Sequence, residues 1–282
     1  MLPKIGFSLQ ANYTLPMAQV LALLKKNGFS AVSPVWTPEL DLPALAAAVS
    51  ENDMTIQSLH APHKGVSLLW QPDAPEAQAP QNAMLQCIED CRKFHIPTLV
   101  IHGWQGLVYT FPAEPLDFRF FDTVIQRTDA YGISVAFENL EGEEYLQALM
   151  TRYRQQTHVG FCWDSGHDHC YPHRLDFLKK FGHRLIMTHL NDNLGIRDPQ
   201  GIAAAEDDLH FLPYDGNLDW VHAISRLKDT PRQEILNFEF KTKSHSSNPQ
   251  DMIYASVSIE HFITEAGRRA RRIAEEYARI MG

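Results

Sequence analysis

Short apolar runs alternate with longer amphipathic segments along the whole chain. The short runs have the length and composition of buried strands, which are expected at about 3–8, 30–34, 55–60, 98–102, 134–138, 159–164, 185–190 and 235–239. The longer segments carry apolar residues at helical spacing and predict helices at about 15–27, 41–52, 79–94, 115–131, 143–151, 172–181, 217–228 and 254–280. Eight strand–helix units predict an α/β protein with a (β/α)8 TIM barrel, and an open doubly wound sheet is the alternative.

Local signals support these element boundaries. Pro16 suits the first turn of a helix, and Gly28 suits the position just after its end. Asp41 precedes the next apolar-periodic segment and is expected to cap it. No linker or low-complexity tract divides the chain, so residues 1–282 are expected to form a single domain.

Six of the expected strands end in a residue that can bind a metal. These strand-end residues are His60, His102, Glu138, Asp164, His189 and Glu239. All parallel strands of a closed barrel end at one face, so these side chains are expected to converge there. Converging carboxylates repel one another unless a cation lies between them. The pattern therefore predicts a divalent metal centre, with satisfied histidines at the rim as the alternative for His60 and His102.

Further candidate residues follow these strand ends. His167 lies three residues after Asp164, and the long connection 191–216 carries Asp208 and His210. The connection 60–79 is also long, and long loops at this face are usually functional. Lys241 follows Glu239 by two residues and would point to the same side, where it would meet an anionic substrate oxygen or neutralise the carboxylates. Trp104 is a candidate for the wall of a sugar pocket, with loop packing as the alternative.

The remaining titratable residues receive a simpler interpretation. Five other histidines have no matching position and are expected to be solvated or to support the site from behind: His63, His95, His169, His183 and His245. The four cysteines form no CxxC pair and are interpreted as core thiols of a reducing compartment.

Charge and hydropathy bear on partners and location. The formal net charge of −9 disfavours a nucleic-acid partner. No apolar stretch is long enough to span a bilayer. The first residues run into a strand without a charged leader or a cleavage signal, so a cytoplasmic protein is expected.

Four segments resemble the xylose-isomerase-like barrel superfamily, which holds sugar isomerases and epimerases together with type IV apurinic endonucleases. The segments are Phe137-Glu-Asn, Trp163-Asp-Ser-Gly-His167, Thr188-His-Leu-Asn-Asp192 and Asn237-Phe-Glu-Phe-Lys241. By this resemblance the shared metal site would be Glu138, Asp164, His189 and Glu239. The endonuclease branch binds three ions, and the resemblance implies further ligands for them: His60 and His102 with a bridging Glu138, and the set His167, Asp208 and His210.

The resemblance implies two kinds of chemistry. In a sugar isomerase or epimerase, a metal ion grips a carbonyl and a neighbouring hydroxyl, and Glu138 and Glu239 remove and return a proton from opposite sides of the barrel mouth. In an endonuclease, the ions position a hydroxide and bind a phosphodiester. The expected active-face loops carry Lys64 and Arg197 as basic residues, among several acidic ones. Because substrate choice resides in such loops, the isomerase or epimerase is preferred.

Several alternatives stay open on the sequence alone. A phosphodiesterase of the apurinic endonuclease kind, a metal-dependent sugar dehydratase and a sugar-binding barrel without activity fit the same residues. The ligand types suit Mn, Zn, Co or Mg, with one ion expected and up to three accommodated. The expected partner is a small carbohydrate, and the last helix is a candidate surface for packing on a second copy of the chain.

Overall fold

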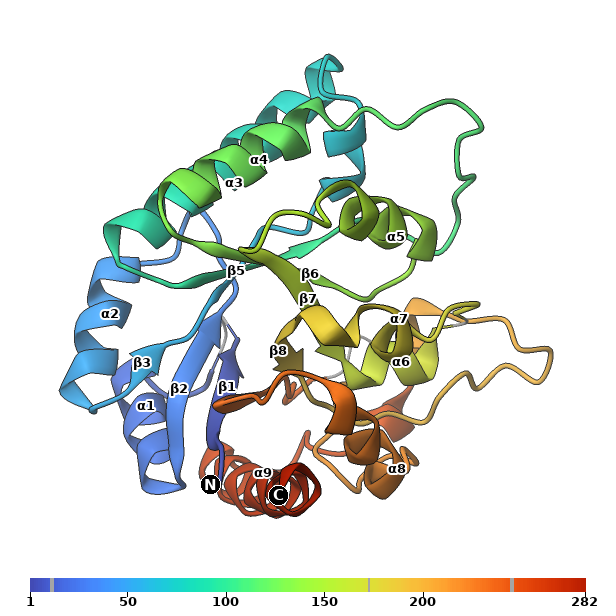
Figure 1. Cartoon of the computed structure of the whole chain (residues 1–282). Coiled ribbons are helices and arrows are strands. Elements are labelled where there is room, and N and C mark those ends of the chain that lie inside the picture. The colour runs from blue at the N-terminus through green and yellow to red at the C-terminus, as the bar shows by residue number, and fades with distance from the viewer. Residues whose placement is uncertain (11–12, 172, 244–245) are drawn as a thin grey trace.

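The apolar runs form parallel strands that curl around one axis, and the amphipathic segments form helices that surround them (Figure 1). The computed structural model of the chain describes residues 1–10, 13–171, 173–243 and 246–282. Its strands are β1 (Lys4–Leu9), β2 (Phe29–Pro34), β3 (Thr55–Ile56), β4 (Leu59–His60), β5 (Thr98–His102), β6 (Ser134–Glu138), β7 (Val159–Asp164), β8 (Leu185–His189) and β9 (Ile235–Phe238). This arrangement confirms the predicted α/β barrel.

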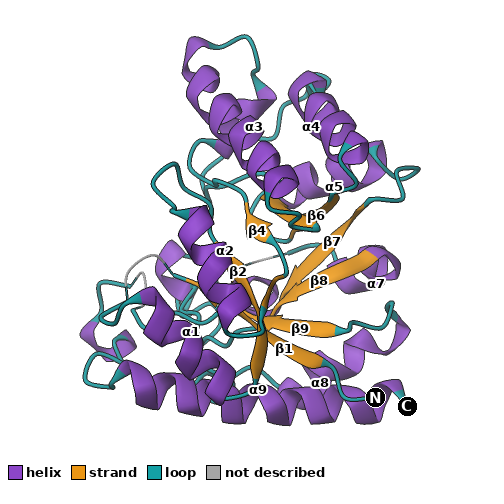
Figure 2. Cartoon of the chain, turned by 90° about the vertical axis from the view of Figure 1, so that its left-hand side faces the viewer, coloured by secondary structure: helices purple, strands orange, loops and turns teal. Residues whose placement is uncertain are grey.

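The helices lie outside the strands, as the side view shows (Figure 2). They are α1 (Met17–Lys26), α2 (Leu42–Glu51), α3 (Gln78–Lys93), α4 (Arg119–Ala130), α5 (Glu143–Arg152), α6 (Ser165–Cys170), α7 (Phe177–Phe181), α8 (Trp220–Ser225) and α9 (Ile259–Met281). The boundary signals are confirmed at two places. The Asp41 carboxylate accepts a hydrogen bond from Ala44 N at 3.0 Å and caps α2. Gly28 adopts φ +93° just after α1, a conformation that favours glycine.

The hydrogen-bonded strands form two sheets, in the orders β3-β2-β1-β9 and β4-β5-β6-β7-β8. Single bridges between Val35 and His60 and between Leu190 and Phe238 join them into the barrel. The prediction of one continuous strand at 55–60 was therefore wrong. Gln57 N still donates to Val32 O of β2 at 2.8 Å, whereas Ala61 N donates to Val100 O of β5 at 2.8 Å. The chain changes partner between these residues, and this break divides the predicted strand.

The period of two along each strand separates the barrel interior from the helix-facing core. Val100, Ala136, Cys162 and Met187 form a small buried cluster, and each stands two residues before a strand-end residue. The residues between them, such as Phe137, Phe161 and Trp163, belong to the large core beneath the helices. The apolar interior layer therefore lies directly below the layer that carries the candidate ligands.

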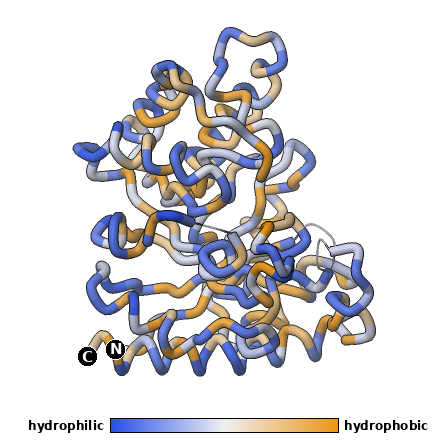
Figure 3. Tube along the Cα trace, turned by 90° about the vertical axis from the view of Figure 1, so that its right-hand side faces the viewer, coloured by the Kyte–Doolittle hydropathy of each residue, from blue (hydrophilic) through white to orange (hydrophobic). Residues whose placement is uncertain are grey.

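Helix α9 packs on the outside of the barrel against α1, α8 and β1, and hydrophobic and hydrophilic residues alternate along it (Figure 3). Its close approach to the chain after α1 depends on Gly267, because a Cβ there would lie 2.4 Å from Asn27 O. On its polar side, Arg269 pairs with Asp215 at 2.6 Å and Arg272 lies over the Tyr214 ring. Within the described residues, no helix combines the length and the apolar character needed to cross a bilayer.

Candidate metal centre

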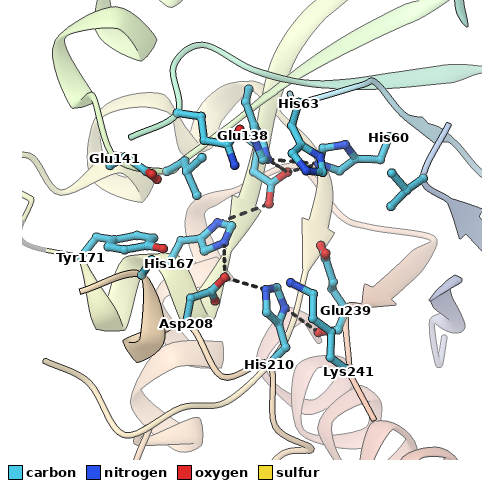
Figure 4. Close-up of a pocket in the computed structure, with 15 residues that line it drawn as sticks. His60, His63, Glu138, Glu141, His167, Tyr171, Asp208, His210, Glu239 and Lys241 are labelled. Atoms are coloured by element: carbon cyan, nitrogen blue, oxygen red, sulfur yellow. Dashed lines mark hydrogen bonds and ion pairs between the residues drawn. The ribbon is translucent and has the colours of Figure 1, made fainter. Parts of the chain in front are cut away.

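A cavity of about 400 Å³ opens at the carboxyl ends of the strands. The strand register places His102 beside Glu138 and Asp164 beside His189. The lining residues are Val35, His60, His63, His102, Gln105, Glu138, Leu140, Glu141, His167, Tyr171, Ala205, Asp208, His210, Glu239 and Lys241 (Figure 4). The nine residues singled out as candidate ligands fall into three groups within and just below this cavity.

The first group joins Glu138, Asp164, His189 and Glu239, whose ligand atoms all lie within 4.8 Å of one another. Nδ1 of His189 lies 2.9 Å from Glu138 Oε1 and 2.8 Å from Glu239 Oε2. Ligands about 2.1 Å from a shared ion would be separated by roughly 3 Å. The spacing of these atoms therefore fits ligands that face a common centre.

The second group joins His60, His102 and Glu138. Both Nε2 atoms lie 3.3 Å from Glu138 Oε2, and they lie 3.1 Å from each other. Glu138 is thus shared, because Oε1 faces the first group and Oε2 faces the second. This is the geometry of a carboxylate that bridges two ion positions.

The third group joins His167, Asp208 and His210. Asp208 Oδ2 lies 2.8 Å from His210 Nε2 and 3.5 Å from His167 Nε2. His210 adopts φ +50°, an uncommon conformation for a non-glycine residue. Arg197 helps to hold the loop that carries Asp208 and His210, because it pairs with the buried carboxylates of Asp207 and Asp251.

The histidine tautomers indicate which nitrogens are free to bind a cation. Nδ1 of His60, His167 and His210 donates to backbone oxygens of Ala61, Asn139 and Glu239 at 2.8, 2.9 and 3.1 Å. A carbonyl oxygen only accepts, so Nδ1 carries a proton, and Nε2 is the nitrogen left to bind a second proton or a metal ion. In each ring, that Nε2 faces a carboxylate oxygen at 2.8–3.5 Å, a contact that either a proton on Nε2 or a shared metal ion would satisfy. Metal-binding histidines are commonly oriented in this way.

The electrostatics of the buried groups fit the same interpretation. Burial raises the pKa of Asp164 to about 6 and lowers the pKa of His102 to about 4. Burial alone would lower the pKa of His167, but the carboxylates of Asp164 and Asp208 raise it well above its usual range. Oε2 of Glu138 and of Glu239 have imidazole nitrogens as their close polar neighbours among the described residues. The donor set of buried carboxylates and imidazoles therefore fits divalent ions.

Neighbouring polar groups hold Asp164 in place. Asn139 accepts from Asp164 N and donates to Asp164 O, both at 2.8 Å. Nδ2 of Asn191 donates to Asp164 Oδ2 at 2.8 Å, while Asp164 Oδ1 caps α6 by accepting from His167 N at 2.7 Å. Helix α6 was not predicted, and this cap is the reason that it begins at a candidate ligand. Gly166 is required there, because a Cβ would lie 1.9 Å from Asn191 Oδ1.

The structure also places residues that the sequence interpretation did not assign to the cavity. His63 lies on its wall, and so do Gln105, Glu141 and Tyr171. Cys162 is buried below His189 and shares a possible ligand group with it and Glu138. Strand alternation could have signalled Cys162, which stands two residues before Asp164. The four residues of the cavity wall lie in loops, where no period marks them.

The remaining candidates are located as follows. Lys241 lies in the cavity wall beside Glu239 and His210 (Figure 4). Trp104 is not among the lining residues; it stacks on Tyr145 with ring centroids 4.3 Å apart. Its contact with substrate stays a prediction. Three of the other histidines lie outside the cavity lining, namely His95, His169 and His183, and His245 lies outside the described residues.

Comparisons with known proteins agree with this architecture. One curated relative, the uncharacterized protein y4fM of Sinorhizobium fredii, is 36% identical over 168 residues, which cover 56% of this chain and 50% of that protein. The match thus spans half the length of the relative. Among solved structures, the IolI protein with a bound zinc atom is similar over 97% of this chain and 99% of its own, with a TM-score of 0.73 and 17% identity.

A second solved structure is D-psicose 3-epimerase with D-tagatose, from Clostridium cellulolyticum. It covers 99% of each chain, with a TM-score of 0.64 and 12% identity. At these identities the solved structures show the shared fold alone. The sequence model of the xylose isomerase-like TIM barrel family matches residues 21–260. This chain therefore belongs to the xylose isomerase-like TIM barrel family.

Proposed function

We propose that this protein is a metal-dependent sugar or sugar-phosphate isomerase or epimerase. The observation that carries the proposal is the placement of two carboxylates, Glu138 and Glu239, on either side of His189 at the base of a cavity of small-molecule size. Glu239 is the more accessible of the two, with 14% of its side chain exposed, whereas the Glu138 side chain is fully buried. Similar folds in a zinc-binding protein and in sugar epimerases support the choice of substrate class.

The reaction we propose is an intramolecular proton transfer. Glu138, Asp164, His189 and Glu239 would hold the divalent ion, which when bound acts as a Lewis acid on a sugar carbonyl and lowers the pKa of the neighbouring C–H. Glu239 takes the proton from that carbon, and Glu138 returns a proton from the other side. Return to the same carbon from the opposite face inverts it. Return to the former carbonyl carbon, with the hydroxyl proton of the first carbon passing to the former carbonyl oxygen, exchanges aldose and ketose. Lys241 is placed to orient a substrate oxygen beside Glu239.

A second candidate function is phosphoester hydrolysis with three ions. The observation that favours it is the presence of all three ligand groups, with Glu138 shared by two of them. The groups contain four carboxylates, so one divalent ion leaves the site with net negative charge, whereas three ions make it net positive. A positive site attracts phosphate, and a negative one favours a neutral sugar. The number of bound ions therefore separates the two functions.

The surroundings of the cavity do not favour a nucleic acid as the substrate. Arg197 is the basic residue of the connection 191–216, and its guanidinium is already engaged with Asp207 at 2.8 Å and Asp251 at 2.6 Å. Backbone phosphates are usually bound by arginines and lysines that reach out from the surface. A small carbohydrate is the better match for this cavity.

The test combines elemental analysis with two activity assays on the metal-loaded protein. In D2O, NMR should show deuterium entering the carbon next to the carbonyl of D-tagatose or D-fructose, with about one ion per chain. Loss of exchange on chelation and its return with Mn²⁺ or Zn²⁺ would support the proposal. About three ions per chain, no exchange, and hydrolysis of bis(4-nitrophenyl) phosphate would overturn it in favour of the second candidate.

A further inference from the structure

The wall of the cavity that lies away from Lys241 carries a carboxylate that the proposed reaction does not use. Figure 4 shows Glu141 and Tyr171 on this side, while Lys241 and Glu239 lie on the other. Glu141 belongs to none of the three candidate ligand groups. It follows Glu138 by three residues, just beyond the end of β6.

The Glu141 carboxylate is held in one orientation. Its Oε1 accepts a hydrogen bond from Gly106 N at 2.8 Å. The Trp104 indole in turn donates to Gly106 O at 3.0 Å and stacks on Tyr145. Gly106 adopts φ +121°, a backbone conformation that favours glycine. The loop after β5 therefore serves to aim this carboxylate.

Its second oxygen has no matching donor. Glu141 Oε2 is buried and receives no hydrogen bond from the described residues. A buried charged oxygen without a partner costs free energy, so native structures normally supply one. The two glutamates that begin α5 are not left with a buried, unpartnered oxygen: Glu143 accepts from Arg174 N at 2.7 Å, and Glu144 accepts from the Tyr109 hydroxyl at 2.5 Å. Of the three, Glu141 is the one whose second oxygen is both buried and without a donor among the described residues, and the one that lines the cavity of the candidate ligands.

We infer that Glu141 is a specificity-determining residue, whose Oε2 accepts a hydrogen bond from a hydroxyl or ammonium group of the substrate. This inference rests on the proposed function and names a second point of recognition for the same cavity. The substrate then spans the cavity, with its reacting end at Glu239 and Lys241 and a donor group at Glu141. Trp104 is a positioning residue in this arrangement, because it acts on Glu141 through Gly106.

The test is a coupling experiment by isothermal titration calorimetry on the metal-loaded protein. The ligands are D-fructose and the series of its monodeoxy analogues, and the variant is Glu141→Gln. The glutamine oxygen can still accept from Gly106 N, while its NH2 group replaces the free acceptor. Because hydrogen bonds to charged groups are the stronger ones, we expect D-fructose to bind Glu141→Gln about tenfold or more weakly.

Coupling distinguishes recognition from a structural effect. One deoxy analogue should bind the wild type as weakly as D-fructose binds the variant, and it should lose nothing further in the variant. If the natural donor is an ammonium group, the analogue with an amino group in place of that hydroxyl should bind the wild type more tightly than D-fructose does. The matched control is Glu144→Gln, which removes the same charge three residues along the chain, outside the lining of this cavity, and should bind every ligand as the wild type does.

The outcomes separate this inference from the proposed function. The role of Glu141 would be overturned if Glu141→Gln lowered the affinity for D-fructose and for every deoxy analogue by the same factor. It would also be overturned if the affinity for D-fructose changed by less than twofold. Binding with the expected coupling but without deuterium exchange would leave that role standing and reject the proposed reaction. A wild type that binds neither D-fructose nor any analogue would reject both.

Discussion

Removal of metal should lower the thermal stability of this protein by an amount that reports the number of bound ions. Without a cation, carboxylates and imidazole lone pairs face one another across distances of 2.8–3.5 Å in all three groups. An ion that binds only the folded state stabilises it by about 2.7 kcal/mol when its free concentration is a hundred times its Kd. Each occupied group should therefore contribute separately to the melting temperature.

The size of the shift follows from the length of the chain. With 282 residues and an unfolding entropy of about 2.1 cal/mol/K per residue, about 0.6 kcal/mol corresponds to one degree. At a hundredfold excess over Kd, one occupied group should raise Tm by about 5 °C, and three groups should raise it by about 14 °C. The measurement is differential scanning calorimetry of chelated protein with and without Zn²⁺ or Mn²⁺, together with elemental analysis.

Substitution within one group supplies the control. Asp208→Asn removes the carboxylate of the third group and should remove about 5 °C of the shift if that group is occupied. Asp198→Asn alters an exposed aspartate of the same loop and should leave the shift unchanged. The metal interpretation would be refuted by a chelated protein that melts within about 2 °C of the metal-supplemented one while less than one ion per chain is found.

Three further outcomes are expected. Glu239→Gln should lower kcat for deuterium exchange into D-tagatose by about a hundredfold to ten-thousandfold while the circular dichroism spectrum is unchanged; wild-type activity in this variant would reject the two-carboxylate scheme. A duplex with an abasic site should stay intact at modest enzyme excess, and chelator-sensitive incision seen on a denaturing gel would contradict this. Arg197→Met should lower the free energy of unfolding in urea by about 3 kcal/mol, because it leaves buried Asp207 and Asp251 unpaired, whereas exposed Arg268→Met should change it by less than about 0.5 kcal/mol.

The strand ends were predictable because parallel strands impose a strict order. A period of two fixes which residues face the barrel interior, and the closed barrel brings all carboxyl ends to one face. The convergence of Glu138, Asp164, His189 and Glu239 could therefore be predicted from the sequence, and the structure shows it. The prediction of one domain over 1–282, the cytoplasmic location and the packing of α9 on a second copy stay predictions.

The loop residues were harder to predict because their positions depend on contacts distant in sequence. The loop that carries Asp208 and His210 is held in part by Arg197, which pairs with Asp207 of the same loop and with Asp251, 54 residues later. Glu141 depends in the same way on the Gly106 amide, 35 residues earlier. Neither contact has a spacing rule that a sequence pattern could express.

The role of Glu138 links the number of ions to the kind of reaction. Its Oε1 faces His189 and its Oε2 faces His60 and His102. When ions occupy both groups, both oxygens of this carboxylate are engaged, and it has no free lone pair aimed at a substrate carbon. Proton transfer by Glu138 therefore requires that the group of His60 and His102 be empty or occupied by substrate. A protein that holds three ions and still exchanges the proton of a sugar would have to rely on Glu239 as its carboxylate base, and Lys241 would be the neighbouring group placed to return the proton.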